Sequence, residues 1–239
     1  MKKLVVCGCS FLTSSYNRYH DLKGSSWPDF FDFKFDHLND ELKKEITEWE
    51  YDHNVSFIDL LVTDRRLKYK NLAFGGASNF MIRLQIDRAI KLNPDYIIVG
   101  ATSTERIEVP MPELDIDHML TWPAYQKEIE QDFNRKKAIE YYLRFLSDDK
   151  VTELKSYYII KSGLDQIEKL GIPYVFLQGP SPMKDQDWSS YNVWPINEKQ
   201  PWDFVNDKRI DFSRGNHLPI DIHKQMAKTL DKLTKNWSN

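Results

Sequence analysis

The chain has 239 residues, of which 41% are hydrophobic and 13% aromatic, and its formal net charge is −3. This length fits one sizeable α/β domain, and the apolar content suffices for a packed core, which excludes wholesale disorder. General nucleic-acid binding is disfavoured because it requires clustered Lys and Arg, and no long basic run is present.

The cysteines and the hydrophobic runs restrict the class of protein further. Cys7 and Cys9 lie two residues apart, so on a strand they point the same way, which suits neither a disulfide nor a four-ligand zinc site. No apolar run approaches the roughly 20 residues that cross a bilayer. The apolar stretch after Lys3 is also shorter than the ~7–15 residues of a signal peptide. We therefore expect a soluble protein without a signal peptide, a membrane partner or a nucleic-acid partner.

The first predicted element is a strand over residues 4–7, an unbroken apolar run typical of strands buried on both faces. The run stops at Gly8, which permits a sharp turn. Ser10 would then lie at the carboxyl edge of the sheet, where open α/β sheets bind ligands. The simpler interpretation is that Ser10 caps the following helix, as serine often does. These residues alone favour the cap.

The remaining elements follow after a polar loop over residues 13–26. Further strands are predicted near residues 70–74, 96–99 and 174–177. Helices are predicted to begin at Trp27-Pro28, within residues 57–62, and over residues 81–92, 124–146, 151–170 and 219–233, with a proline-marked loop over residues 110–123. Because strands and helices alternate, we expect an α/β fold with a parallel sheet and helices on both faces. Residues 1–239 are predicted to form one domain, with irregular insertions near residues 34–68 and 181–216.

Three of the predicted strands end in small, polar residues, which a parallel sheet would bring to one edge. The three segments are Gly8-Cys9-Ser10, Gly75-Gly76-Ala77-Ser78 and Gly100-Ala101-Thr102-Ser103. Glycines there let backbone N–H groups approach a ligand, and Ser10 adds a hydroxyl. For acyl transfer, this edge would hold a nucleophile beside an oxyanion hole. The general base is then missing from these segments, and the candidates for it are His217 and His223.

Four blocks of the chain, taken in order, resemble the SGNH (GDSL-type) hydrolases. The blocks are Gly8-Cys9-Ser10-Phe11, residues 71–79, residues 94–100, and the segment from Asn216-His217 through residues 223–227. The nearest similarity is to the small SGNH-like proteins of bacteriophages, many of which combine Gly-Cys-Ser with a Gly-Gly-Ala-Ser-Asn block. The resemblance implies a three-layer α/β/α sandwich with a flavodoxin-like parallel sheet of strand order 2-1-3-4-5.

The resemblance also implies catalytic roles. Ser10 matches the nucleophile and His217 the histidine that takes its proton, while the N–H groups of Ser10 and Gly76 match the oxyanion hole. The implied reaction is hydrolysis of small acyl esters, such as O-acetyl groups on a polysaccharide, without a cofactor or a metal ion. The expected partners are therefore an acyl ester or acylated carbohydrate, together with a virion component or a second copy of the chain. The expected location is the cytoplasm of the producing cell or a phage particle.

The oxyanion positions depart from the family pattern. Cys9 replaces the usual aspartate, at a position that serves turn geometry more than chemistry. The family's asparagine falls at Thr102, so the side-chain oxyanion donor is changed or lost. Thr102 itself is one candidate for that donor, and Asn79 or Ser103 could substitute for it.

The position of the triad's acid also differs from the family pattern. The place about three residues before the histidine holds Arg214. Asp211 is the nearest upstream carboxylate and is the candidate acid, and Asp221 is the nearest one downstream. A histidine oriented by a backbone carbonyl would still act as a base, with less stabilisation of the imidazolium.

Other interpretations stay open. A catalytically degenerate SGNH domain could serve as a glycan-binding or structural component of a phage particle, which the replaced Asp and Asn motivate. A flavodoxin-like nucleotide or phosphate binder would use the same glycine-rich edge, but the chain has no P-loop lysine. Trp188 and Trp194 are candidates for lining a sugar site, although tryptophans more often pack in the core.

Overall fold

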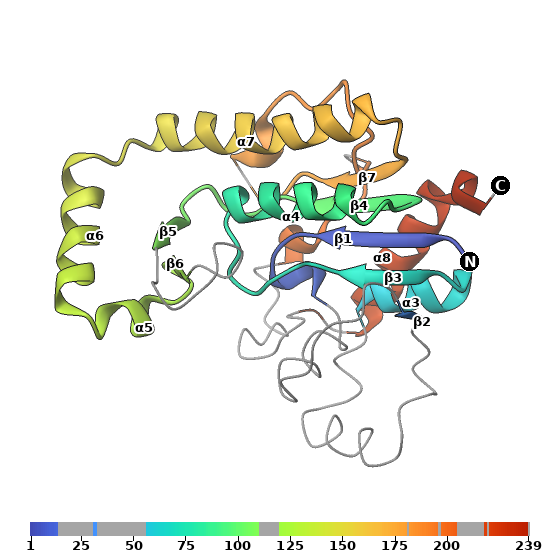
Figure 1. Ribbon diagram of the computed structural model, residues 1–239, viewed down its shortest axis with the longest axis horizontal. Coiled ribbons are helices and arrows are strands. Elements are labelled where there is room, and N and C mark those ends of the chain that lie inside the picture. Colours follow the sequence, from blue (N-terminus) through green and yellow to red (C-terminus); the bar gives the residue numbers. More distant parts are fainter. Residues whose placement is uncertain are drawn as a thin grey trace, which may run out of the picture.

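The computed structural model describes residues 1–13, 31–32, 56–109, 120–180, 182–195, 197–204, 218 and 220–238. Their largest unit is a five-stranded sheet of order β2-β3-β1-β4-β7 (Figure 1). The strands are β1 (Lys3–Cys7), β2 (Phe31–Asp32), β3 (Lys68–Asn71), β4 (Tyr96–Gly100) and β7 (Tyr174–Leu177). β2 pairs antiparallel with β3, and the other four strands are parallel. The helix predicted to begin at Trp27-Pro28 is wrong at residues 31–32, which pair as a strand instead.

The predicted α/β class with a parallel sheet is confirmed. β1 lies in the middle of the sheet, and its residues from Leu4 to Cys7 have no exposed surface. Their unbroken apolar run follows from this position, because both faces and both edges of β1 are covered. Counted in chain order, the four parallel strands lie in the order 2-1-3-4. A fifth parallel strand is not found in the part of the chain that the structure describes.

Helices cover the sheet in two pairs (Figure 1). The first pair is α4 (Asn79–Lys91), which lies on β1 and β4, and α7 (Asp149–Lys169) beside it. The second pair is α3 (Phe57–Arg65) and α8 (Ile220–Leu233). Right-handed crossovers from β1 to β3 and from β3 to β4 run in opposite directions along the sheet, so they place α3 and α4 on opposite faces. The helices predicted in these four regions are confirmed.

Between β4 and α7 the chain forms an arm beyond the carboxyl ends of the strands (Figure 1). The arm comprises an antiparallel pair, β5 (Ile107–Val109) and β6 (Leu120–Trp122), followed by α5 (Gln126–Glu130) and α6 (Phe133–Phe145). Neither short strand was predicted. The helical region predicted over residues 124–146 is confirmed. It consists of two helices, because Asp132 accepts hydrogen bonds from two backbone N–H groups and thereby begins a new helix.

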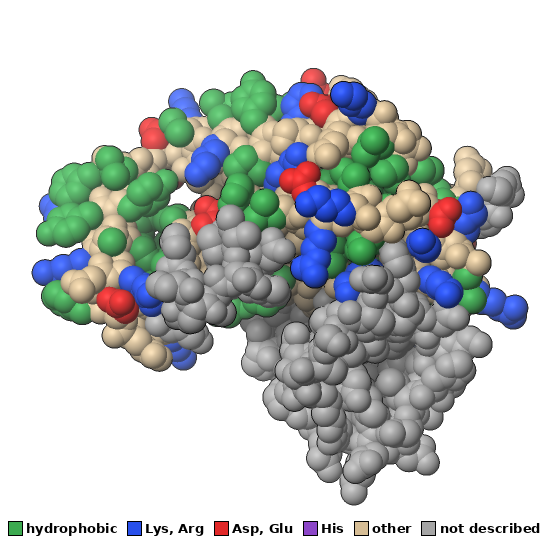
Figure 2. Space-filling view, viewed as in Figure 1, with side chains coloured by type: hydrophobic (Ala, Val, Ile, Leu, Met, Phe, Trp, Pro, Cys, Tyr) green, Lys and Arg blue, Asp and Glu red, His purple; other side chains and the backbone are tan. Residues whose placement is uncertain are grey.

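The arm contributes little to the main core. A separate small cluster of Val109, Ile129 and Ile139 holds it together. Ile139 is the one buried residue of α6, whereas Phe133, Tyr141 and Phe145 are each at least 60% exposed. Figure 2 shows hydrophobic side chains gathered over α6. Exposed aromatic side chains in this number are typical of an interaction surface. The partner expected from the sequence, a virion component or a second copy of the chain, stays a prediction.

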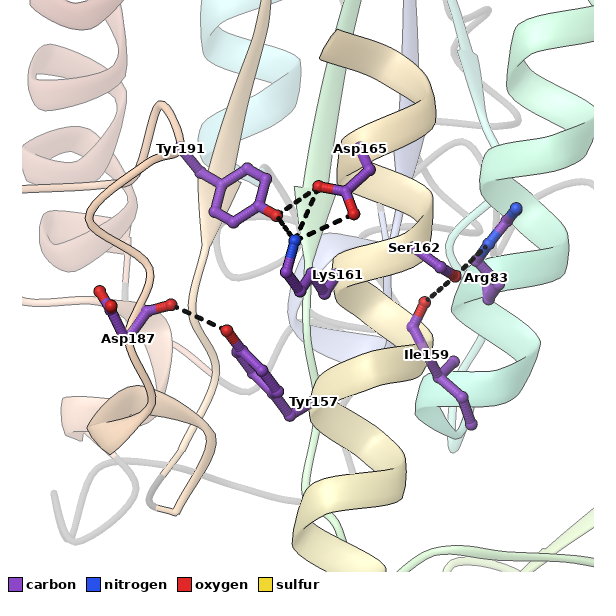
Figure 3. Close-up of polar contacts among 8 residues, drawn as sticks. All are labelled: Arg83, Tyr157, Ile159, Lys161, Ser162, Asp165, Asp187 and Tyr191. Carbon is purple, nitrogen blue, oxygen red and sulfur yellow. Dashed lines mark hydrogen bonds and ion pairs between the residues drawn. The ribbon is translucent and has the colours of Figure 1, made fainter. Parts of the chain in front are cut away.

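The segment after β7 is irregular and is held against α7 (Figure 3). It contains two short 3-10 helices, η5 (Met183–Asp185) and η6 (Pro201–Phe204), and a third, η7 (Lys235–Ser238), follows α8. Lys161 of α7 donates to Tyr191 Oη at 2.6 Å and lies 3.0 Å from both carboxylate oxygens of Asp165. The Tyr157 hydroxyl donates to the Asp187 carbonyl at 3.2 Å. No described helix is both long enough and apolar enough to span a bilayer.

Candidate active site

The segments that follow β1, β3 and β4 meet at the carboxyl edge of the sheet. β1 pairs with β3 on one side and with β4 on the other. The pairing with β3 continues past both strands, because the backbone N–H of Phe74 donates to the Gly8 carbonyl at 3.1 Å. The turn at Ser10 therefore has Gly75-Gly76 on one side and Thr102 on the other.

Ser10 begins the short 3-10 helix η1 (Ser10–Leu12). Its carbonyl accepts hydrogen bonds from the hydroxyl of Thr13 at 2.6 Å and from the Thr13 backbone N–H at 3.3 Å. The N-cap residue of η1 is Cys9, and no side chain caps this helix. The helix-cap interpretation of Ser10 is therefore wrong. The Ser10 side chain is half-buried, and its hydroxyl has no hydrogen-bond partner among the described residues.

Asn71, at the end of β3, fixes the Ser10 turn from the neighbouring strand. Its side-chain N–H donates to the carbonyl of Leu12 at 2.8 Å, and its side-chain oxygen accepts from the backbone N–H of Ala73 at 2.9 Å. Asn71 is only 3% exposed, so these bonds are sheltered from water and costly to leave unmade. The turn that presents Ser10 is thus held by a buried carboxamide that was not among the predicted site residues.

A second carboxamide joins α4 to the end of β4. Asn79 Nδ2 donates to the Thr102 carbonyl at 3.1 Å, and the Thr102 backbone N–H donates to Asn79 Oδ1 at 2.9 Å. The Thr102 side chain is fully covered, and its hydroxyl has no hydrogen-bond partner among the described residues. Asn79 and Thr102, both predicted as oxyanion donors, thus lie together at this edge and first serve to fix the backbone there. Their roles toward an oxyanion stay predictions.

Gly76 is in the left-handed region, with φ at 78°, a conformation that glycine adopts without strain. A Cβ at this position would lie 2.6 Å from Tyr125 Cε2, so any side chain would collide with the arm. The backbone N–H of Gly76 has no hydrogen-bond partner within the described part of the chain. An N–H left unpaired at this edge is what an oxyanion hole requires.

The predicted base and acid, His217 and Asp211, lie outside the described residues. His223 of α8 is described and is fully buried. Its Nδ1 accepts a hydrogen bond from the backbone N–H of Phe57 at 3.1 Å, and burial lowers its pKa to about 4. His223 therefore packs as a neutral imidazole, which confirms the packing role and leaves His217 as the candidate base. Asp221 lies in the first turn of α8 and is exposed.

The tryptophans predicted to line a sugar site are core residues instead. Trp188 is 2% exposed, and its ring packs on Tyr157 and Phe176 with centroid distances of 4.8 Å. Trp194 has no exposed surface. A covered ring offers no face on which a sugar can stack, so the prediction for Trp188 and Trp194 is wrong in this structure. Their large apolar area stabilises the irregular segment.

A cavity of about 660 Å³ lies between the arm and the body of the molecule, bordering the candidate site at Asn79. Its wall includes the aromatic rings of Trp122 and Tyr142 and the carboxylates of Glu105 and Glu108. Ser10 is not part of this wall. The cavity has the size of a small-molecule site, and it lies on the side of the edge where β4 ends.

No family model matches the chain, and a search of curated proteins finds no match. The arrangement at the carboxyl edge combines an unengaged serine hydroxyl with an unpaired backbone N–H, as far as the described residues extend, and both lie on rigidly held turns.

Proposed function

We propose that the chain is a serine esterase of the SGNH type that hydrolyses small acyl esters, such as O-acetyl groups on a polysaccharide. The observation that carries the proposal is the position of Ser10. It lies three residues after the end of the central strand of the sheet, its hydroxyl has no partner among the described residues, and the Gly75-Gly76 turn lies beside it. The strand order 2-1-3-4 is compatible with the flavodoxin-like order 2-1-3-4-5.

The proposed reaction has two steps. His217 takes the proton from the Ser10 hydroxyl, whose oxygen attacks the ester carbonyl and forms a tetrahedral oxyanion. The N–H groups of Ser10 and Gly76 stabilise the oxyanion, which collapses as the alcohol leaves with the proton from His217. Water then adds to the acyl-enzyme with the same proton transfers, and the carboxylic acid is released. Asp211 is proposed to orient His217.

Serine-directed labelling tests the proposal. A fluorophosphonate probe should label the wild type and not Ser10→Ala, and hydrolysis of p-nitrophenyl acetate should fall at least 10³-fold in that variant. Ser189→Ala is the matched control, since Ser189 is exposed and its hydroxyl is already bonded to Asp187 in the segment after β7. A wild type that neither reacts with the probe nor hydrolyses the ester would refute the esterase.

The base and the acid are tested separately. His217→Gln should lower kcat by about 10³-fold or more, whereas Asp211→Asn should lower it less if the acid only orients the imidazole. Asp221→Asn serves as the comparison, because Asp221 is exposed on α8. Loss of activity in Asp221→Asn with full activity in Asp211→Asn would reassign the acid.

One observation favours the alternative, a catalytically degenerate SGNH domain that binds a glycan or serves as a structural part of a phage particle. The hydroxyl of Thr102, at the position of the family's side-chain donor, is fully covered. An oxyanion hole built from backbone N–H groups alone would be weaker by about 10²–10³ in rate. An inert wild type that binds an acetylated polysaccharide with micromolar affinity would support this alternative.

A further inference from the structure

Three consecutive carbonyl groups of the Gly75–Ala77 turn are held by side chains of the segment that follows β4. Tyr125 Oη donates to the Gly75 carbonyl at 2.7 Å, Thr121 Oγ1 to the Gly76 carbonyl at 2.5 Å, and Arg106 Nη1 to the Ala77 carbonyl at 2.5 Å. Thr121 is fully buried and Tyr125 is half-buried. The whole turn is therefore oriented by side chains located in or beside the arm.

The hydrogen bond from Tyr125 to the Gly75 carbonyl also affects the N–H of Gly76. The Gly75 carbonyl and the Gly76 N–H belong to one planar trans peptide, so they point in opposite directions. A hydroxyl that fixes the carbonyl also fixes the direction of the N–H. A hydrogen bond to the oxygen further polarises the peptide and makes its N–H a stronger donor. Tyr125 thereby acts on the one N–H of the turn that the proposed oxyanion hole uses.

The ring of Tyr125 also packs against the Gly75–Ala77 turn. The Tyr125 ring stacks near Phe74 with a centroid distance of 6.3 Å, and the edge of the ring occupies the volume where a Cβ of residue 76 would lie. The ring thus packs on the turn from the side of its carbonyl groups. The hydroxyl adds a directional bond to a position that packing already restricts.

We propose that Tyr125 is a positioning residue that aims and polarises the Gly76 N–H toward the oxyanion, with Thr121 as its support. This inference rests on the proposed esterase reaction. It assigns the arm a function beyond its own folding, because the arm completes an oxyanion hole whose other parts lie on the sheet edge. The part of the reaction affected is stabilisation of the tetrahedral intermediate and not binding of the ester.

Tyr125→Phe is the decisive variant, because it removes only the hydroxyl and keeps the ring. Loss of one oxyanion donor costs about 10²–10³ in rate, so loosening a donor that remains present should cost on the order of 10-fold in kcat. The KM for p-nitrophenyl acetate should stay within about twofold, since the lost interaction is made only in the transition state. Tyr141→Phe is the matched control, because Tyr141 is an exposed arm tyrosine, 60% accessible.

The second readout is the amide resonance of Gly76 in a ¹⁵N-labelled Ser10→Ala background, which requires no activity. Tyr125→Phe should shift the Gly76 amide proton upfield and increase its hydrogen exchange, and Tyr141→Phe should leave both unchanged. An unchanged Gly76 amide, or an unchanged kcat in active protein, overturns the positioning role. If the wild type is inert while the amide shifts, the esterase proposal fails and the orientation of the turn by Tyr125 stands.

Discussion

The side chain of Gln85 forms two hydrogen bonds with the backbone of Gly8. The Gly8 N–H donates to Gln85 Oε1 at 2.6 Å, and Gln85 Nε2 donates to the Gly8 carbonyl at 3.2 Å. Gln85 comes from α4 and is only 6% exposed. The chain therefore leaves β1 at a residue that is fixed on both its backbone polar groups, two positions before Ser10.

Replacement of Gln85 by alanine should destabilise the fold. The variant leaves the buried N–H of Gly8 without a partner, which costs about 1–3 kcal/mol. Lys91→Ala, at an exposed position of the same helix, should stay within about 0.5 kcal/mol. Urea unfolding of the wild type and the two variants measures the difference in stability. Equal stabilities for the two variants would contradict a stabilising role of the hydrogen bonds between Gln85 and Gly8.

A second prediction concerns the packing of Leu12 between two glycines. A Cβ at Gly100 would lie 2.3 Å from Leu12 Cδ1, and a Cβ at Gly8 would lie 2.4 Å from the same atom. Gly100→Ala should therefore destabilise by about 1–3 kcal/mol through overpacking. Combined with Leu12→Ala, which opens the space, the same change should cost less, with a coupling energy of at least about 0.5 kcal/mol.

The control for this cycle is Gly171→Ala. Gly171 has φ at 64°, and no atom lies within 4 Å of the place that a Cβ would take, so its alanine variant is strained without contacting Leu12. Its cost should be the same with and without Leu12→Ala. Denaturant unfolding of the four proteins of the Gly100 cycle measures the coupling. If the costs of Gly100→Ala and Leu12→Ala simply add, contact with Leu12 is not the reason that position 100 requires glycine.

His223 should make stability fall as the pH drops. Its folded-state pKa is lowered to about 4 by burial, with Asp221 opposing the shift, while an unfolded histidine titrates near 6.5. Between those values the unfolded chain binds the extra proton, so lowering the pH from about 6.5 to 4 favours unfolding by roughly 3 kcal/mol. Above pH 6.5 this contribution is constant.

His223→Asn separates this titration from the others in the chain. Asparagine keeps an acceptor for the N–H of Phe57, which bonds to Nδ1 in the wild type, and it does not titrate. The stability of the variant should therefore depend less on pH between 4 and 6.5. Parallel slopes for variant and wild type across that range, from urea midpoints at each pH, would exclude His223 as the source.

The stability of the irregular segment after β7 should depend more on the packing of Trp188 than on the ionic contacts of the segment with α7. Trp188 is buried and its Nε1 donates to the Met183 carbonyl at 2.7 Å, so Trp188→Ala should cost about 3–5 kcal/mol. Tyr191→Phe removes the hydroxyl between Lys161 and Asp165 (Figure 3). That network lies near the surface, and its loss should cost less than about 1 kcal/mol. Guanidinium unfolding should reproduce this ranking, and the reverse order would contradict it.

The elements that could be predicted from the sequence are those with a strong local pattern. β1, β4 and β7 are continuous apolar runs, and α8 has a clear apolar face, so each was found near its observed bounds. β5 and β6 are three residues each, which is too short to show alternation. The break at Asp132 was missed because a capping aspartate inside a helical pattern resembles any other polar position.

The candidate site was predictable only where a local sequence pattern marks its residues. Ser10 follows a recognisable strand, whereas Tyr125 reaches Gly75 across 50 residues of sequence, and no local pattern encodes such a contact. Gln85 did carry a signal, since it is a polar residue between Ile82 and Ile86 on the apolar face of α4. The glycine at position 8 was expected for a sharp turn, and the structure shows that Leu12 also restricts that position.

The place of β1 in the sheet has a consequence for synthesis. β1 is made before both of its neighbours, and Cys7 pairs with Val99. At ~5–20 residues per second, on the order of ten seconds pass before that partner leaves the ribosome. β3 is made earlier and can cover one edge of β1, but until β4 is made residues 4–7 form an apolar segment whose other edge is open, which is a template for aggregation. Nascent chains that stall before β4 should therefore be the species that most need a chaperone.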